Sequence, residues 1–175
     1  GEGKRKPKAE TSVSTAPVQP HFQLCVLKAG RAPVAADLAR AYVAVPVLRP
    51  AAAIKPLGRL APQDVAGHTL VPGRWVPRAG ILVAFRMKDS GLEPRVPRGA
   101  MALVDLRPWP VEKLTNRLAA VWIRDKGLRL RQIVRQPSGR YLAQSLASGN
   151  RGSFPFRPEH GDRIVGRLKG VVAPL

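Results

Sequence analysis

Ser90 is the hydroxyl group that we consider first as a nucleophile, because it lies in a chemically suggestive stretch, residues 85–105. A serine hydroxyl attacks poorly until a base takes its proton, and a lysine serves as that base only when burial lowers its pKa. Lys126 belongs to the predicted turn 125–127, where we expect it to stay solvated and charged. The residue types alone therefore give Ser90 no activating partner.

Four other reactive side chains, Cys25, His68, Asp89 and His160, would act together only if the fold gathers them. The sequence contains no metal-ligand spacing, no P-loop and no dinucleotide-binding fingerprint, so we expect neither a metal nor a cofactor. A single cysteine excludes an internal disulfide and suits a reducing cytoplasm.

The elements that would position Ser90 are a strand end, a polar turn, a loop and a second strand. Met101, Leu103 and Asp105 alternate with Ala102 and Val104, and this period of two predicts a strand. Proline fixes φ and glycine permits positive φ, so the loop before that strand is set by Pro94, Pro97 and Gly99.

Residues 85–105 resemble the nucleophile segment of the LexA-like, S24-type self-cleaving repressors, whose pattern is roughly V-x-G-D-S-M-E-P-x-I-P-x-G-D-x-v-l-V-D. In a gap-free alignment Gly91 falls on the catalytic serine, and Ser90 falls on the preceding Asp. Residues 148–158 and 162–172 also resemble segments of that family, so the resemblance covers roughly residues 43–175. The aligned positions after Gly91 are Glu93-Pro94, Val96-Pro97, Gly99 and Leu103-Val104-Asp105.

The family cleaves its own chain with a Ser–Lys dyad, and here the lysine position is occupied by Arg131, within residues 128–133. A guanidinium keeps its proton in proteins and cannot be the general base. The resemblance therefore implies a mainly β, LexA-like peptidase fold without peptidase activity. Ser90 stays open as an alternative nucleophile, although neighbouring residues of an extended chain point to opposite faces.

The bond that the family cuts corresponds to Ala53-Ile54, where the family has Gly after the bond. A β-branched Ile54 lacks the backbone freedom of glycine and would crowd the attacking group. Two other Ala-Gly pairs occur, Ala66-Gly67 and Ala79-Gly80. Both lie much closer to Gly91 in the sequence than the cleaved bond of the family lies to its nucleophile, so we interpret their glycines as turn residues.

The resemblance implies a regulatory and dimerisation domain of a bacterial or phage transcriptional regulator, linked to stress or DNA damage such as the SOS response. DNA would be read by a separate domain outside this sequence. Two alternatives stay open: an accessory subunit of DNA repair or translesion synthesis, and an active self-cleaving serine peptidase that uses Ser90. We expect a homodimer on the closing strand 163–172, an edge strand whose alternation leaves Ile164 and Leu168 to be covered.

The composition indicates many short strands and an anionic partner. Eighteen prolines and sixteen glycines in 175 residues argue against a helical bundle. The formal charge of +19 favours nucleic acid as a partner, with a basic proteome bias as the other explanation. No apolar run reaches the roughly 20 residues of a membrane span, so we expect a cytoplasmic protein.

Three regions are expected along the chain. Residues 1–20 have the composition of a flexible basic tail, residues 21–45 form a strand and helix extension, and residues 46–175 form the LexA-like domain. Pro33 at the first position predicts one short helix over residues 33–42. The tail residues that could contact phosphates are Lys4, Arg5, Lys6 and Lys8.

Overall fold

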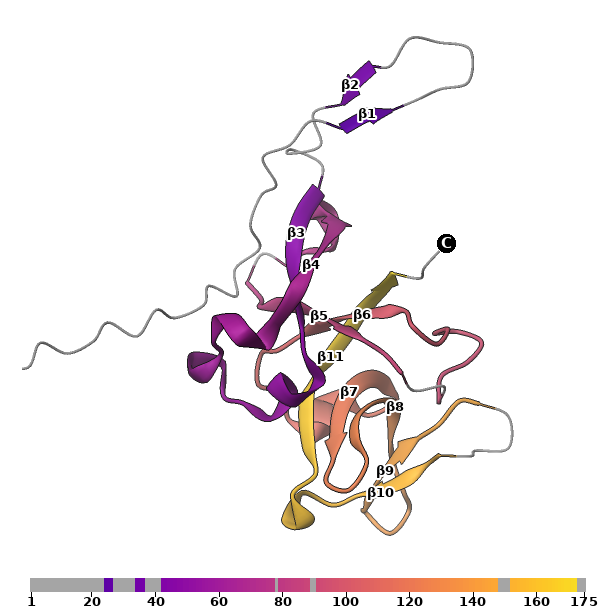
Figure 1. Ribbon diagram of the computed structural model, residues 1–175. Helices are drawn as coiled ribbons and strands as arrows, with labels where there is room; N and C mark the ends of the chain where they lie inside the picture. The colour runs from indigo at the N-terminus through magenta and orange to yellow at the C-terminus, as the bar shows by residue number, and fades with distance from the viewer. Residues whose placement is uncertain are drawn as a thin grey trace, which may run out of the picture.

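The computed structural model describes residues 24–26, 34–36, 42–77, 79–88, 91–147 and 152–172. The mainly β fold is confirmed, because the described strands form a nine-stranded sheet in the order β10-β9-β8-β7-β11-β6-β5-β3-β4, and a separate two-stranded sheet (Figure 1). The strands of the large sheet are β3 (Tyr42–Leu48), β4 (Val65–Pro72), β5 (Leu82–Arg86), β6 (Met101–Asp105), β7 (Arg117–Ile123), β8 (Gly127–Arg135), β9 (Tyr141–Gln144), β10 (Phe154–Phe156) and β11 (Arg163–Val172).

The helical segments of the described residues are all 3-10 helices of three to five residues. Such short turns suit a chain with many prolines, because proline is tolerated at the first position of a helix and prevents a long one. These segments are η1 (Pro50–Ile54), η2 (Leu57–Arg59), η3 (Pro62–Asp64), η4 (Gly73–Trp75), η5 (Val111–Leu114) and η7 (Pro158–His160).

The helix expected over residues 33–42 is wrong where the structure describes that segment. Strand β2 (Val34–Ala36) pairs antiparallel with β1 (Leu24–Val26) instead. Helix propensity is a weak preference, and pairing with a second strand satisfies the same backbone groups. Tyr42 begins β3, and the other residues of the expected helix lie outside the described ranges.

Strands β7, β8 and β9 form an antiparallel meander. β7 pairs with β8 from Arg117↔Ile133 to Ile123↔Gly127, and β8 pairs in turn with β9. The apolar strand before residue 86 is also buried, with the residues from Leu82 to Phe85 fully inaccessible to solvent. The pairing of β3 with β5 is parallel, whereas the other strand pairs of the described residues are antiparallel.

Strand β11 (Arg163–Val172) lies between β7 and β6 in the order of the large sheet, so the expectation that it is an edge strand along its whole length is wrong. Its first half pairs with β7 as far as Arg167, and its second half pairs with β6 from Arg167 onward. Figure 1 shows β11, in yellow, running from the β7–β10 hairpins to β5 and β6. Alternation within one strand reports which faces are covered and carries no information about its neighbours on either side.

Gly166 allows β11 to change partners. A Cβ atom on this residue would overlap the backbone carbonyl oxygen of Asp105 in β6. The register of β11 shifts beside this point, between Ile164 and Gly166 and again between Leu168 and Gly170. Irregularities of this kind bend a strand, and here they join the two halves of the sheet.

The largest apolar cluster packs the loop after β5 against the sheet. Met87, Leu92 and Val96 of that loop are buried with Phe85 and Leu130. Apolar contacts therefore hold the loop in place although it has no regular structure of its own. In the described part of the chain, no helix is long and apolar enough to cross a membrane.

Candidate functional site

The loop that carries Gly91 is fixed at both ends. Leu92 and Val96 anchor it in the core, and the Val96 N–H donates to the Leu92 carbonyl at 3.1 Å. The Gly99 N–H donates to the carbonyl of Met87 at 2.8 Å, which closes the loop at the end of β5. Gly91 is therefore held in a defined position at the start of this loop.

The carbonyl group of Gly91 joins the loop to the end of β9. It accepts hydrogen bonds from the Leu146 N–H at 2.8 Å and from the Ala147 N–H at 3.2 Å. The buried hydroxyl of Ser145 donates to the same oxygen at 2.8 Å. These contacts bring Gly91 next to the strands β8 and β9, far along the chain.

The structure brings Gly91 and Arg131 into direct contact. An ideal Cβ atom on residue 91 would overlap Nη1 of Arg131 and would lie 2.8 Å from Nη2. Real Cβ atoms do not approach other heavy atoms so closely, so a side chain on residue 91 and this arginine conformation exclude each other. The guanidinium therefore fills the space that a serine side chain on residue 91 would need.

Arg131 is held from several sides in this position. The arginine is only 2% exposed, and it comes from the middle of β8. Its Nε donates to the Gly152 carbonyl at 2.8 Å, and its Nη1 donates to the Leu130 carbonyl at 2.6 Å. The guanidinium also lies 5.3 Å from the centroid of the Phe154 ring, a distance typical of a cation–π contact. Arg131 is thus a buried structural cation, and the sequence pattern around it does not predict this role.

Ser145 is a site residue that the sequence analysis missed. Its hydroxyl donates to the Gly91 carbonyl and accepts from the Ala147 N–H at 3.2 Å. Its own N–H donates to the hydroxyl of Ser153 at 2.9 Å. A serine after a short strand carries no sequence signal for this role, because the partner carbonyl lies 54 positions away.

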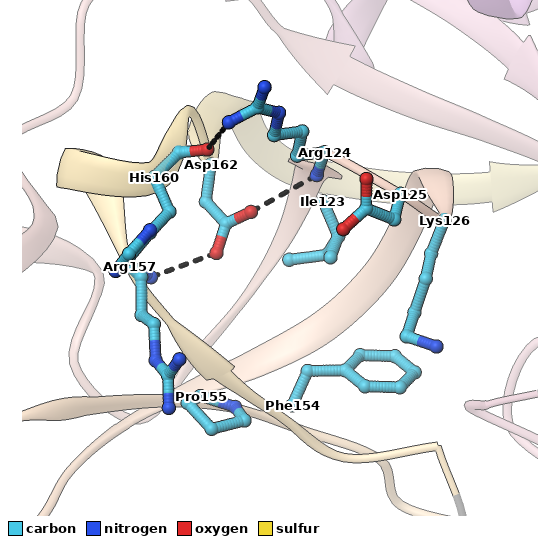
Figure 2. A pocket seen from close by; sticks show the side chains of 9 residues that line it. All are labelled: Ile123, Arg124, Asp125, Lys126, Phe154, Pro155, Arg157, His160 and Asp162. Carbon is cyan, nitrogen blue, oxygen red and sulfur yellow. Dashed lines mark hydrogen bonds between the residues drawn. The ribbon is translucent and has the colours of Figure 1, made fainter.

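A cavity of about 410 Å³, shown in Figure 2, is lined by Phe154, the ring that the Arg131 guanidinium contacts. Lys126 reaches over the same Phe154 ring that Arg131 contacts, with Nζ 4.8 Å from the ring centroid. On the other side of the cavity, Asp162 accepts the backbone N–H groups of Arg124 at 3.1 Å and of Arg157 at 2.8 Å. Asp162 therefore fastens the start of β11 to the β7–β8 turn.

Ala53 and Ile54, which the sequence resemblance aligns with the bond cut in LexA-like proteins, line a different cavity. This cavity of about 280 Å³ is lined by η1, by Phe85 and by residues of β11 that include Ile164. Ile54 is 42% exposed, whereas Gly91 is buried. Ala53 and Ile54 therefore line a cavity with residues of β11, and neither Gly91 nor Arg131 is among the lining residues of that cavity.

The two residues expected at a dimer interface pack against the protein's own core. Ile164 is partly buried against the cluster that contains Val121 and Ile133. Leu168 is partly buried against the largest cluster, with Val104 and Ala120. Both side chains thus already have partners within the chain.

Several expected site residues cannot be placed. Ser90 and Asp89 lie outside the described residues, as do the tail residues Lys4, Arg5, Lys6 and Lys8. Cys25 belongs to β1, whose backbone pairing is described.

The two described histidines of the expected set are not brought together. His68 is exposed on β4, at one end of the strand order, and His160 is exposed in η7, after β10 at the other end. The carboxylate of Glu159 lies 3.9 Å from Nε2 of His160. Among the residues with described positions, no three His, Cys, Asp or Glu side chains gather as a metal site.

Two buried carboxylates away from Gly91 and Arg131, those of Asp105 and Asp64, form ion pairs with basic side chains. Asp105 is fully buried, and its Oδ2 lies 2.6 Å from Nη2 of Arg107; this hydrogen bond raises the pKa of the Arg107 guanidinium. Asp64 accepts from Nζ of Lys55 at 2.6 Å and from the Ala61 N–H at 2.9 Å. Both hydrogen bonds favour the charged carboxylate, that from Lys55 most, and they lower the pKa of Asp64.

No protein-family model matches this chain, and no curated protein matches it.

Proposed function

We propose that the chain is a non-catalytic regulatory domain of the LexA-like, S24 type, from a cytoplasmic transcriptional regulator linked to stress or DNA damage. The contact between Gly91 and Arg131 supports this proposal, because the two aligned positions meet in space and neither carries the group that catalysis needs. Residue 91 offers no hydroxyl, and the guanidinium of residue 131 keeps its proton. A DNA-reading domain would belong to a part of the regulator outside this sequence.

Incubation at alkaline pH followed by mass spectrometry of the intact chain tests the loss of peptidase activity. Self-cleaving members of this class would be promoted by deprotonation of their lysine, whereas this chain has Arg131 at that position and should keep its full mass. A specific cut between Ala53 and Ile54 that disappears in the Ser90→Ala variant would show an active peptidase and would end the proposal.

We also propose that the domain forms a homodimer. The second half of β11, residues 168–172, pairs with β6 on one side, and no strand of the described residues pairs with its other side. An open strand edge can pair with the same edge of a second copy around a twofold axis. Sedimentation velocity should detect a dimer at tens of micromolar protein, and a monomer throughout the concentration series would contradict this assembly.

An accessory role in DNA repair or translesion synthesis is the second candidate. The observation that favours it is the excess of positive charge, +19 in 175 residues, which suits a protein that works on nucleic acid. The natural reading frame upstream of Gly1 separates the two candidates, since a helix-turn-helix domain there would support the transcriptional regulator.

A further inference from the structure

Four cations surround one cavity between the end of β5 and the turn that joins β7 to β8. The cavity has a volume of about 290 Å³. Its cationic residues are Arg86, Lys88, Lys126 and Arg129, so the described lining carries a formal charge of +4, and none of the lining residues is acidic. Three of the four are exposed and Arg129 is partly buried.

Among the described residues, none of these four cations forms an ion pair with a carboxylate. The ion pairs there join Lys55 to Asp64, Arg107 to Asp105 and His160 to Glu159, and none of them involves the four cations of this cavity. A fifth cation lies close by, because Nε of Arg98 donates to the backbone carbonyl of Lys88 at 3.1 Å. Like charges that lie close together repel one another, and a cleft lined by charges of one sign attracts ligands of the opposite sign.

The floor of the cavity is apolar and includes an aromatic ring. Met87 and Leu128 are buried beneath it, and Trp122 is partly exposed. The cavity also reaches Gly127, which has no side chain, and a Cβ atom there would lie 3.8 Å from the Trp122 ring. A partly exposed aromatic ring within a rim of cations combines the two features that bind single strands of nucleic acid, namely stacking of bases and neutralisation of phosphates.

We propose that this cavity binds single-stranded nucleic acid, with one base against Trp122 and the adjacent phosphates on Arg86, Lys88 and Arg129. Lys126, whose ammonium lies over the Phe154 ring, adds positive charge at the rim. A nucleic-acid strand fits better than an acidic peptide, because it supplies regularly spaced phosphates together with an aromatic base. A duplex fits less well, because its bases are already stacked and cannot reach Trp122. This inference does not depend on the loss of peptidase activity proposed above.

Fluorescence anisotropy with a labelled oligothymidine of about 16 nucleotides tests the proposal with the full chain. We expect the Arg86→Gln/Lys88→Gln variant to bind at least about tenfold more weakly. Its plot of log K against log salt should be shallower by about 1.4, since each phosphate contact on a single strand contributes roughly 0.7 to the slope. The matched control is Arg59→Gln/Lys113→Gln, which removes the same charge from exposed residues outside the cavity.

A second variant separates stacking from charge. Trp122→Leu should weaken binding by between about fivefold and a hundredfold, the range for loss of one stacked base, and should leave the salt slope unchanged. Circular dichroism checks that each variant is folded. If Trp122→Leu fails to fold, the comparison of Arg86→Gln/Lys88→Gln with its control variant still decides whether the cavity binds the strand.

Four results would overturn the proposal. The first is a control variant that loses as much affinity as the cavity variant, which would mean that binding is spread over the whole basic surface. The second is a folded Trp122→Leu variant that binds the oligothymidine as tightly as the unmodified chain. The third and fourth are tight binding of a duplex of equal length and tight binding of polyglutamate, each equal to that of the single strand and with the same dependence on Arg86 and Lys88.

Discussion

The guanidinium of Arg131 lies in the space that any side chain on residue 91 would have to occupy, so Gly91 and Arg131 depend on each other. The carbonyl of Gly91 is bound by the end of β9, and the guanidinium is bound by the Gly152 and Leu130 carbonyls. Neither residue can move aside without breaking these hydrogen bonds. The pair is therefore a packed structural unit at the two positions that the family resemblance assigns to catalysis.

The Gly91→Ala substitution should destabilise the protein. One added methyl group overlaps the buried guanidinium, and overpacking of this kind costs roughly 1–3 kcal/mol of the free energy of unfolding. Urea denaturation measures the change. Gly58→Ala is the matched control, because Gly58 is exposed, has φ outside the left-handed region and has no atom within 4 Å of its ideal Cβ position.

A double-mutant cycle shows whether Arg131 causes that loss. In an Arg131→Ala background the guanidinium is gone, so the further change Gly91→Ala should cost much less than in the unmodified protein. Equal costs in the two backgrounds would mean that the methyl group meets some other part of the structure.

Ser145→Ala should cost about 1 kcal/mol of the free energy of unfolding. The buried hydroxyl donates to the Gly91 carbonyl, and that carbonyl keeps two backbone N–H donors after the substitution. Ser138, exposed in the turn before β9, provides the control, since Ser138→Ala should change the stability by less than about 0.5 kcal/mol. Equal effects of the two substitutions would contradict the role given to Ser145.

Asp162→Ala should destabilise the β7–β8 turn and the start of β11 together. The substitution leaves the backbone N–H groups of Arg124 and Arg157 without their carboxylate acceptor, at a cost of roughly 1–3 kcal/mol (Figure 2). Asp125 lines the same cavity and is exposed, so Asp125→Ala should be nearly neutral. Hydrogen exchange in both segments locates the effect, and unchanged protection in either segment would refute the link.

The Asp64–Lys55 pair predicts a loss of stability in acid. The pKa of Asp64 is lower in the folded protein than its ordinary value of 3.8, so the folded state favours the charged carboxylate. Its contribution is fully present above the unfolded pKa, near pH 4, and is lost as the pH falls through the folded pKa. Urea unfolding over a pH series should therefore show a smaller acid-dependent loss for Asp64→Asn than for the unmodified protein. Identical pH profiles would remove Asp64 from the acid response.

The sequence by itself determined the β class and the positions of several elements. Alternation marked β6 (Met101–Asp105), the closing segment 163–172 was expected as a strand, and the turn expected at residues 125–127 lies where β7 meets β8, because these signals depend on neighbouring residues. The loop between β5 and β6 was likewise marked by its prolines and Gly99. Local patterns suffice for such elements because turns and face alternation are set within a few residues.

Only the tertiary structure decided how these elements meet. Residues 34–36, expected in a helix, pair as a strand with β1. Strand β11 lies between β7 and β6 in the large sheet. In both cases, strands from elsewhere in the chain provide the hydrogen-bond partners of the backbone. Long-range contacts also bring Ser145 to Gly91 and collect cations from β5 and from the β7–β8 turn around Trp122. A sequence pattern describes the faces of one segment, whereas such a site depends on which distant segments the fold places against it.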